Sequence, residues 1–230
     1  MAKNVVTKID DAVTIRHALV SVSNKGGLES LAPGLIECCD KLMIYSTGGT
    51  YSSLEKILGA KARQHLMQVA DYTGQPEMQG GLVKTLDFKI YLGLLSETYN
   101  DDHQNDLKRT RAAAIDLVVV NLYPFRETIA KAGVSPEEAR ANIDIGGPCM
   151  IRAAAKNFLR VAVVVDPADY PKLLSEAKQT KGKISLKTRY ELARKAFEHT
   201  AQYDRAIADY LTRTDVATVE KAYPEIMKRK

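Results

Sequence analysis

Residues 116–122 read DLVVVNL, and this run is the clearest buried strand in the chain. Its apolar residues are consecutive rather than alternate, which is typical of a strand in a parallel sheet that is covered on both faces. Other apolar runs of strand length occur at 17–23, 42–46, 65–70, 90–95 and 160–165. Helical patterns separate most of these runs between residues 17 and 179. This alternation predicts an α/β fold with an open parallel sheet and flanking helices.

The two ends of the chain differ from this middle part. Residues 1–15 are polar, and we expect them to form a loose N-terminal arm. We assign residues 16–180 to the sheet domain and residues 181–230 to a helical C-terminal extension of the same unit. In that extension, residues 185–211 carry an apolar stripe at helical spacing. The stripe would pack on the sheet domain or on a partner subunit, and the sequence leaves both open.

Composition argues against several classes of function. The 230 residues are 45% apolar, which suits a sizeable core, and 27% charged. The net charge of +5 fits a mildly basic soluble protein or the attraction of an anionic substrate. The lysines are scattered and tryptophan is absent, which disfavours nucleic-acid binding. No apolar run approaches the roughly 20 residues of a membrane span, and no signal-peptide core precedes the first strand.

Cysteine and histidine usage predicts neither a metal site nor a disulfide. Cys38, Cys39 and Cys149 lack the spacing of metal ligands, and the four histidines are also scattered. An odd number of cysteines suits a reducing compartment. We therefore expect a cytoplasmic protein without a metal ion or another cofactor.

Two loops that follow expected strands suit a phosphate group. In an open α/β sheet, ligands bind outside the carboxyl ends of the strands. Thr47-Gly48-Gly49-Thr50 follows one strand and precedes a helix. The glycines would let the backbone approach an anion, the hydroxyls would donate, and the helix N-terminus would add positive potential. The alternative is a plain tight turn. The loop from Ser21 to Lys25 repeats the pattern, with Lys25 as a point charge.

Polar residues near two further loops extend this candidate site. Asn121 and Tyr123 lie at the end of the most buried strand, where an asparagine has to find a partner in the core or in a ligand. Lys84 and Thr85 follow a Gly-Gly turn, which alone is a weak signal because most such lysines are solvated.

Residues 142–157 (NIDIGGPCMIRAAAKN) are where we place the active site. The stretch joins an acid, Asp144, to two glycines, Gly146 and Gly147, and then to a helix that ends in Lys156. Asp144 could cap this helix, act as an acid, or do both. Lys156 is either an ordinary surface lysine or an amine that transfers protons.

Together these stretches resemble the IMP cyclohydrolase domain of the bifunctional purine-biosynthesis enzymes, whose other domain is the AICAR transformylase. The resemblance is specific because it covers about residues 17–211 in the family's order and no single motif carries it. The matching text is ALVSVSNKGGL, YSTGGT, DYTGQPEMQGGLVKT, DLVVVNLYPF, NIDIGGPCMIRAAAKN, VAVVVDPADY and ELARKAFEHTAQYDRAIADYL. It implies a methylglyoxal-synthase-like fold and closure of FAICAR to IMP with loss of water. It also implies a homodimer, with a separate AICAR transformylase as a further partner.

The resemblance also assigns roles to individual residues. Its catalytic positions fall on Lys84, Tyr123, Asp144 and Lys156. Its nucleotide contacts fall on Ser23, Asn24, Lys25, Thr47, Gly48, Gly49, Thr50, Val83, Thr85, Asn121, Ile145, Gly146 and Gly147. We expect Asp144 and Lys156 to act as a coupled pair that relays protons. Lys84, Asn121, Tyr123 and the backbone near Gly146 would hold the developing oxyanion.

The chain departs from the family pattern at three places. Asn24-Lys25-Gly26 stands for Asp-Lys-Thr, and Asp87-Phe88 stands for His-Pro. Leu82, which belongs to the same motif as Asp87-Phe88, stands for an arginine. The lost cation would weaken phosphate binding by roughly ten- to hundredfold unless Lys25 or Lys84 compensates. The sequence also ends at Lys230 without a transformylase domain, and its polar tail leads us to expect a stand-alone enzyme.

Two other functions remain open for such a fold. The chain could be a non-catalytic nucleotide-binding or regulatory module, because a fold alone does not give an activity. A sensor has no need to keep Lys84, Tyr123, Asp144 and Lys156 together, so their presence favours catalysis. Methylglyoxal synthase is a weaker alternative, because its chemistry rests on a different set of aspartate and histidine residues.

Overall fold

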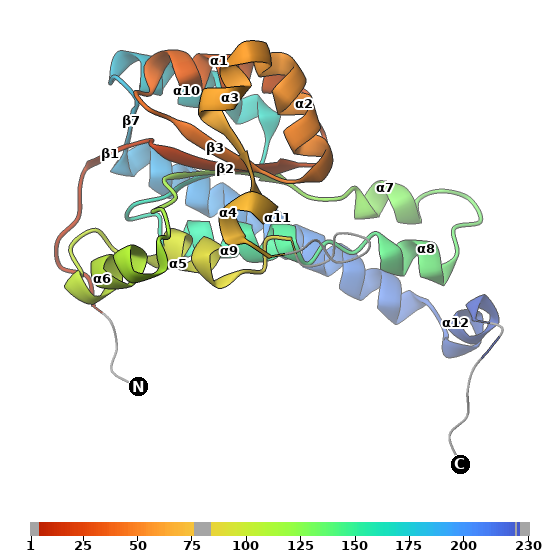
Figure 1. Cartoon of the computed structure of the whole chain (residues 1–230). Coiled ribbons are helices and arrows are strands. Elements are labelled where there is room, and N and C mark those ends of the chain that lie inside the picture. The colour runs from red at the N-terminus through yellow and green to blue at the C-terminus, as the bar shows by residue number, and fades with distance from the viewer. Residues whose placement is uncertain (1–4, 76–83, 224, 226–230) are drawn as a thin grey trace.

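The computed structural model describes residues 5–75, 84–223 and 225, and within them a five-stranded parallel sheet lies between two layers of helices (Figure 1). The strand order is β4-β3-β2-β5-β6, so the chain begins in the middle of the sheet and builds outward in both directions. The strands are β2 (His17–Val22), β3 (Met43–Ser46), β4 (Leu66–Gln68), β5 (Leu117–Asn121) and β6 (Ala162–Val164). The predicted parallel α/β sheet is confirmed.

Both faces of β5 are buried, which explains its unbroken apolar sequence. Leu117 and Val119 belong to one hydrophobic core, while Val118 and Val120 belong to the core on the opposite face. Successive side chains of a strand point to opposite faces, so each core receives every second residue. A strand buried on both sides needs no polar alternation.

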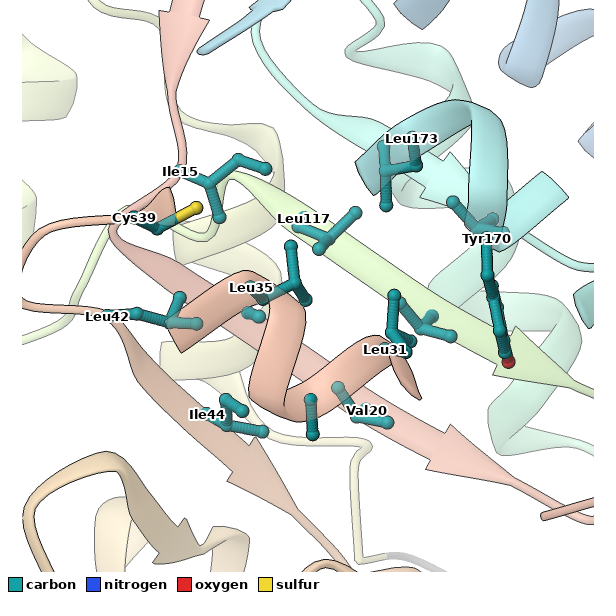
Figure 2. Close-up of a cluster of buried hydrophobic side chains, with 14 of the residues drawn as sticks. Ile15, Val20, Leu31, Leu35, Cys39, Leu42, Ile44, Leu117, Tyr170 and Leu173 are labelled. Atoms are coloured by element: carbon teal, nitrogen blue, oxygen red, sulfur yellow. The ribbon is translucent and has the colours of Figure 1, made fainter. Parts of the chain in front are cut away.

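The first core lies under α1 (Leu28–Cys38), α2 (Gly48–Leu58) and α10 (Tyr170–Gln179) (Figure 1). Figure 2 shows Leu31 and Leu35 of α1 among side chains of the sheet and of α10. Both leucines are at most 1% exposed. Each such side chain contributes roughly 1.5–3 kcal/mol through the area it removes from water. The short η1 (Gly59–Lys61), α3 (Ala62–His65) and η3 (Pro167–Asp169) complete this side.

The second core lies against helices on the opposite face of the sheet (Figure 1). They are α5 (Phe88–Leu95), α6 (Asp101–Thr110), α9 (Gly146–Lys156) and α11 (Leu186–Arg213). Shorter helices follow several strands or end the chain: α4 (Val69–Thr73), α7 (Phe125–Ile129), α8 (Pro136–Ala141) and α12 (Val216–Ala222). Helix α8 begins directly after Ser135, because Ser135 and Glu138 form a capping box.

The expected strand at residues 90–95 is wrong, since this run forms α5. Ile90 and Leu94 are fully buried and lie four residues apart, which is the spacing of one helical face. Asp87 caps the helix by accepting the N–H of Lys89 at 2.8 Å. Asp87, which stands where the family pattern has a histidine, therefore has a local structural role.

The N-terminal arm is not loose throughout. Residues 12–14 form β1 (Ala12–Thr14), which pairs antiparallel with β7 (Lys183–Ser185). Arg189 of α11 also holds the arm in place, because its guanidinium donates to the carbonyls of Asp10 and Asp11 at 2.8 and 3.0 Å. This arginine is fully buried, and its N–H groups donate to backbone carbonyls. It thereby joins the N-terminal arm to the first turns of α11.

The long helix α11 packs on its own domain, which is one of the two alternatives left open by the sequence. It contacts α9 and β6, and buries Leu192, Ala193, Ala196 and Tyr203. Its length agrees with the prediction for residues 185–211. Tyr190 and Phe197 of the same helix stay partly exposed, at 50% and 40%.

Candidate active site

A cavity of about 500 Å³ lies at the carboxyl ends of β2, β3 and β5. The chain reverses its direction of sheet building between β2 and β5, which is where open α/β sheets bind ligands. Its volume suits one small ligand. The predicted residues that line it are Ser23, Lys25, Thr47, Gly48, Gly49, Thr50, Lys84, Thr85, Asn121, Tyr123, Asp144, Ile145, Gly146 and Gly147. The predicted Val83, and Leu82 beside it, lie outside the described residues.

The start of α2 forms one end of the cavity. The helix begins at Gly48, so the first N–H groups of its backbone have no carbonyl of the helix to bind. Thr47, just before it, shares a hydrogen bond with Ser21 at 3.1 Å between the hydroxyl oxygens. The Thr50 hydroxyl bonds the backbone of Val22 as both donor and acceptor, at 3.0 and 3.1 Å. Thr50 therefore joins α2 to β2, and the backbone of the helix start remains for an anion.

Lys25 places a cation at the same end. Its ammonium donates to the carbonyls of Val22 and Ser23, the latter at 3.1 Å. Partial burial lowers the pKa of Lys25 below its usual value. The loop holds this charge at the mouth of the cavity, where it favours an anionic ligand.

Lys84 and Thr85 connect the starts of two helices. The Lys84 ammonium lies 3.2 Å from the position that a Cβ atom on Gly48 would occupy, at the start of α2. The Thr85 hydroxyl lies 2.8 Å from the corresponding position on Gly146, at the start of α9. A methyl group at either glycine would crowd its neighbour. Because Gly48 and Gly146 lack side chains, Lys84 can approach the start of α2 while Thr85 approaches the start of α9.

Asn121 finds its partner in the loop after β2. Its side-chain oxygen accepts the N–H of Asn24 at 2.8 Å, and its amide donates to the Asn24 carbonyl at 3.0 Å. Asn24 does not line the cavity, and its own side chain accepts the N–H of Gly26 at 2.9 Å. Asn24-Lys25-Gly26 is therefore a self-consistent turn, although it differs from the family pattern. Asn121 shapes the site as well as lining it.

Asp144 lies at the other end of the cavity, beside the start of α9. Its carboxylate accepts the N–H of Gly147 at 2.8 Å, so it satisfies a donor in the first turn of the helix. A Cβ atom on Gly147 would meet Asp144 and Leu122 at 2.6 Å each, which only glycine avoids. Burial raises the pKa of Asp144, against smaller opposing effects from the N–H groups of Gly147 and Tyr123. A raised pKa brings a carboxylate closer to proton exchange at neutral pH.

Two large side chains border this acidic end. Tyr123 and Ile145 line the cavity, yet they are 53% and 57% exposed. Exposed apolar surface beside a concave site is typical of a face that a ligand covers. They would contact the flat part of a bound molecule.

Sequence reasoning missed Tyr203 of α11. The Tyr203 hydroxyl accepts the N–H of Asp144 at 2.8 Å and donates to the carbonyl of Asn142 at 3.3 Å. Its helical spacing placed it in the apolar stripe, which reads as core. The hydroxyl on an otherwise apolar stripe was the available signal.

The structure does not bring Lys156 to this cavity. Lys156 is exposed in the last turn of α9, and the 11 residues of that helix separate its ends by roughly 15 Å at 1.5 Å per residue. It lines a different hollow, between α9 and α11, with Tyr190 and Phe197. The expected Asp144–Lys156 pair is therefore not formed within one chain.

In the described parts of the chain, no group of three or more histidine, cysteine or acidic side chains is placed to hold a metal ion. Cys38, Cys39 and Cys149 are free thiols. No helix in residues 5–75, 84–223 and 225 has both the length and the apolar character to cross a membrane.

The chain is similar to known proteins along most of its length. Residues 27–149 match the family model of the MGS-like domain, and residues 154–230 match that of the AICARFT/IMPCHase bienzyme. The bifunctional purine biosynthesis protein PurH of Ruminiclostridium cellulolyticum is 46% identical over 200 residues, which are 87% of this chain and 37% of the relative. PurH of Nostoc punctiforme is 50% identical over 197 residues, or 86% and 37%. The chain thus spans little more than a third of these relatives.

A solved structure matches over its whole length. The crystal structure of ForH aligns with a TM-score of 0.72 and 32% sequence identity, covering 85% of this chain and 98% of that chain. The two family models together match most of the sheet domain and the helical extension, from residue 27 onward. The chain therefore belongs to the MGS-like domain family, and it is similar to part of the AICARFT/IMPCHase bienzyme.

Proposed function

We propose that the chain is an IMP cyclohydrolase, which closes the ring of FAICAR to IMP with loss of water. The observation that carries this proposal is one cavity that joins a cationic, anion-binding end to a partly buried acid. A mononucleotide has the matching layout, with a phosphate at one end and a base at the other. The relatives named as purine biosynthesis proteins support the same substrate class.

The phosphate of the substrate would bind at the start of α2. Lys25 and the free N–H groups of Gly48 and Gly49 supply positive potential there, and Lys84 lies beside Gly48. This arrangement reduces the need for a cation at residue 82. The base would then extend towards Tyr123 and Ile145, with its reacting groups near Asp144.

The reaction needs little from the protein beyond geometry and proton transfer. The carboxamide nitrogen of FAICAR attacks the formyl carbon of the same molecule, so the main task is to hold the reactive rotamer. The attacking nitrogen loses one proton and the formamido nitrogen loses a second, and the formyl oxygen leaves with both as water. Asp144 would accept and return a proton in this sequence. Gly146 and Tyr123 both line the cavity, and the N–H of Gly146 and the Tyr123 hydroxyl would stabilise the oxygen as it gains charge.

A non-catalytic purine-nucleotide module remains a second candidate, and one observation favours it. Lys156, which the resemblance assigns to catalysis, is remote from Asp144 within the chain. A module that only binds IMP could keep the anion-binding end and dispense with this lysine. Under either function, dimerisation and a separate transformylase that supplies FAICAR are further predictions.

One assay separates the two candidates. Purified protein is mixed with FAICAR, and the absorbance change of ring closure is followed beside the Asp144→Asn variant. We expect turnover by the natural sequence and a large loss in the variant. Binding of IMP without turnover would favour the module, and the absence of both binding and turnover would contradict the proposed substrate.

A further inference from the structure

Tyr203 contacts the backbone on both sides of Ile143, in the segment that carries Asp144. Its hydroxyl accepts the N–H of Asp144 at 2.8 Å and donates towards the carbonyl of Asn142 at 3.3 Å. The two partners lie about sixty residues before Tyr203 in the sequence, so α11 supplies a fixed point that the segment itself lacks. Tyr203 does not line the cavity, and its hydrogen bond to Asp144 is made with the main chain.

The ring that carries this hydroxyl is held firmly. Tyr203 is only 8% exposed, and its ring meets that of Phe125 edge-on, with centroids 6.2 Å apart. Arg126 donates to the carbonyl of the neighbouring Gln202 at 3.0 Å, which anchors the same turn of α11. A hydroxyl on so constrained a ring can position its partners with little loss of entropy.

We propose that Tyr203 is a positioning residue for the ring closure, which holds Asp144 at the distance from the substrate that proton transfer requires. The proposal rests on the proposed function and adds a role for the C-terminal helix in it. A side chain that does not contact the ligand can still orient the groups that do. A misplacement of those groups by about 1 Å can cost a large factor in rate.

The structure also says which kinetic constant should change. Without the hydroxyl, the Asp144 N–H and the Asn142 carbonyl lose their shared partner, so the segment gains freedom. The anion-binding end at Lys25 and α2 is built from other elements and stays intact. Binding of the substrate should therefore persist while the chemical step slows.

The test compares Tyr203→Phe with Tyr210→Phe. Tyr210 lies two turns further along α11, and its ring also meets Phe125 edge-on, with centroids 5.8 Å apart. Both variants lose one phenolic hydroxyl from the same helix. We expect Tyr203→Phe to lower kcat by about tenfold or more with KM within about threefold, and Tyr210→Phe to change neither.

A second measurement does not need the variant to fold. In the natural protein, hydrogen exchange followed by NMR should show the Asp144 amide protected by at least about a hundredfold. Free exchange of that amide would overturn the proposal, as would equal kinetics of the two variants. An inactive natural protein would instead overturn the proposed function, and with it any role of Tyr203 in ring closure.

Discussion

The ammonium nitrogen of Lys84 lies 3.2 Å from the position that a Cβ atom on Gly48 would occupy. Gly48 also has a φ of +42°, a backbone conformation that side chains disfavour. Sterics and backbone conformation thus both demand glycine at the start of α2. The absence of a side chain allows a lysine from a distant part of the chain to approach a helix N-terminus.

Gly48→Ala should therefore weaken substrate binding more than turnover. The added methyl group displaces the Lys84 ammonium and strains the first turn of α2. Loss of a charge-assisted hydrogen bond to phosphate corresponds to a rise in KM of roughly ten- to hundredfold. Steady-state kinetics beside Ser52→Ala, an exposed change on the same helix, would check this. An unchanged KM would show that the phosphate does not bind at Gly48.

Asp144 should set the acidic limit of activity. Burial raises its pKa, so its carboxylate form is lost at a higher pH than that of an exposed aspartate. If the carboxylate accepts a proton, kcat/KM should rise with pH through this raised pKa. Asp144→Asn keeps an oxygen for the Gly147 N–H but cannot accept a proton, and should lower kcat by about 10²–10⁴. A pH profile of both forms tests this, and a profile that is flat on its acidic side would contradict it.

The sequence predicted the sheet and most of its strand ends, because both depend on local patterns. The strand at residues 116–122 could be predicted because burial on both faces leaves an unbroken apolar run. Residues 90–95 were not, because a short apolar run suits a strand and a buried helix equally. β1 escaped notice for another reason. Its three residues pair with β7, which lies some 170 residues later, and Arg189 of α11 binds the two residues that precede them.

The site shows the same division. Loops after neighbouring parallel strands meet at one edge of a sheet, so their convergence could be predicted. Asp144 and Lys156 are close in sequence, but the structure does not place them together. The helix α9 lies between them, and its length separates the two side chains. The crowding at Gly146 arises from Thr85, and that at Gly147 from Leu122 as well as Asp144. Thr85 and Leu122 are distant in sequence, and no local pattern reports such contacts.

The buried ion pair of Asp116 and Arg160 should matter for stability. Their charged atoms lie 3.0 Å apart with side chains 10% and 7% exposed, and Asp116 also accepts the N–H groups of Arg16 and His17. Asp116→Ala leaves a buried, unpaired guanidinium, so we expect a loss of about 3–5 kcal/mol in the free energy of unfolding. Glu191→Ala breaks the exposed pair with Lys172, which solvent screens, and should therefore cost much less. Urea unfolding of both variants tests the contrast, which equal losses would contradict.

Lys156→Ala tests whether the cavity of one chain is sufficient. Lys156 lies at the far end of α9 from Asp144, so a chain that acts alone should keep kcat within about threefold of the natural value. A loss of about a hundredfold or more would mean that the amine transfers protons. The geometry would then require the amine of a second copy, because α9 is rigid and its ends do not approach. Mixing Lys156→Ala with Asp144→Asn would decide this case, since activity regained in the mixture can arise only from a site shared between two chains.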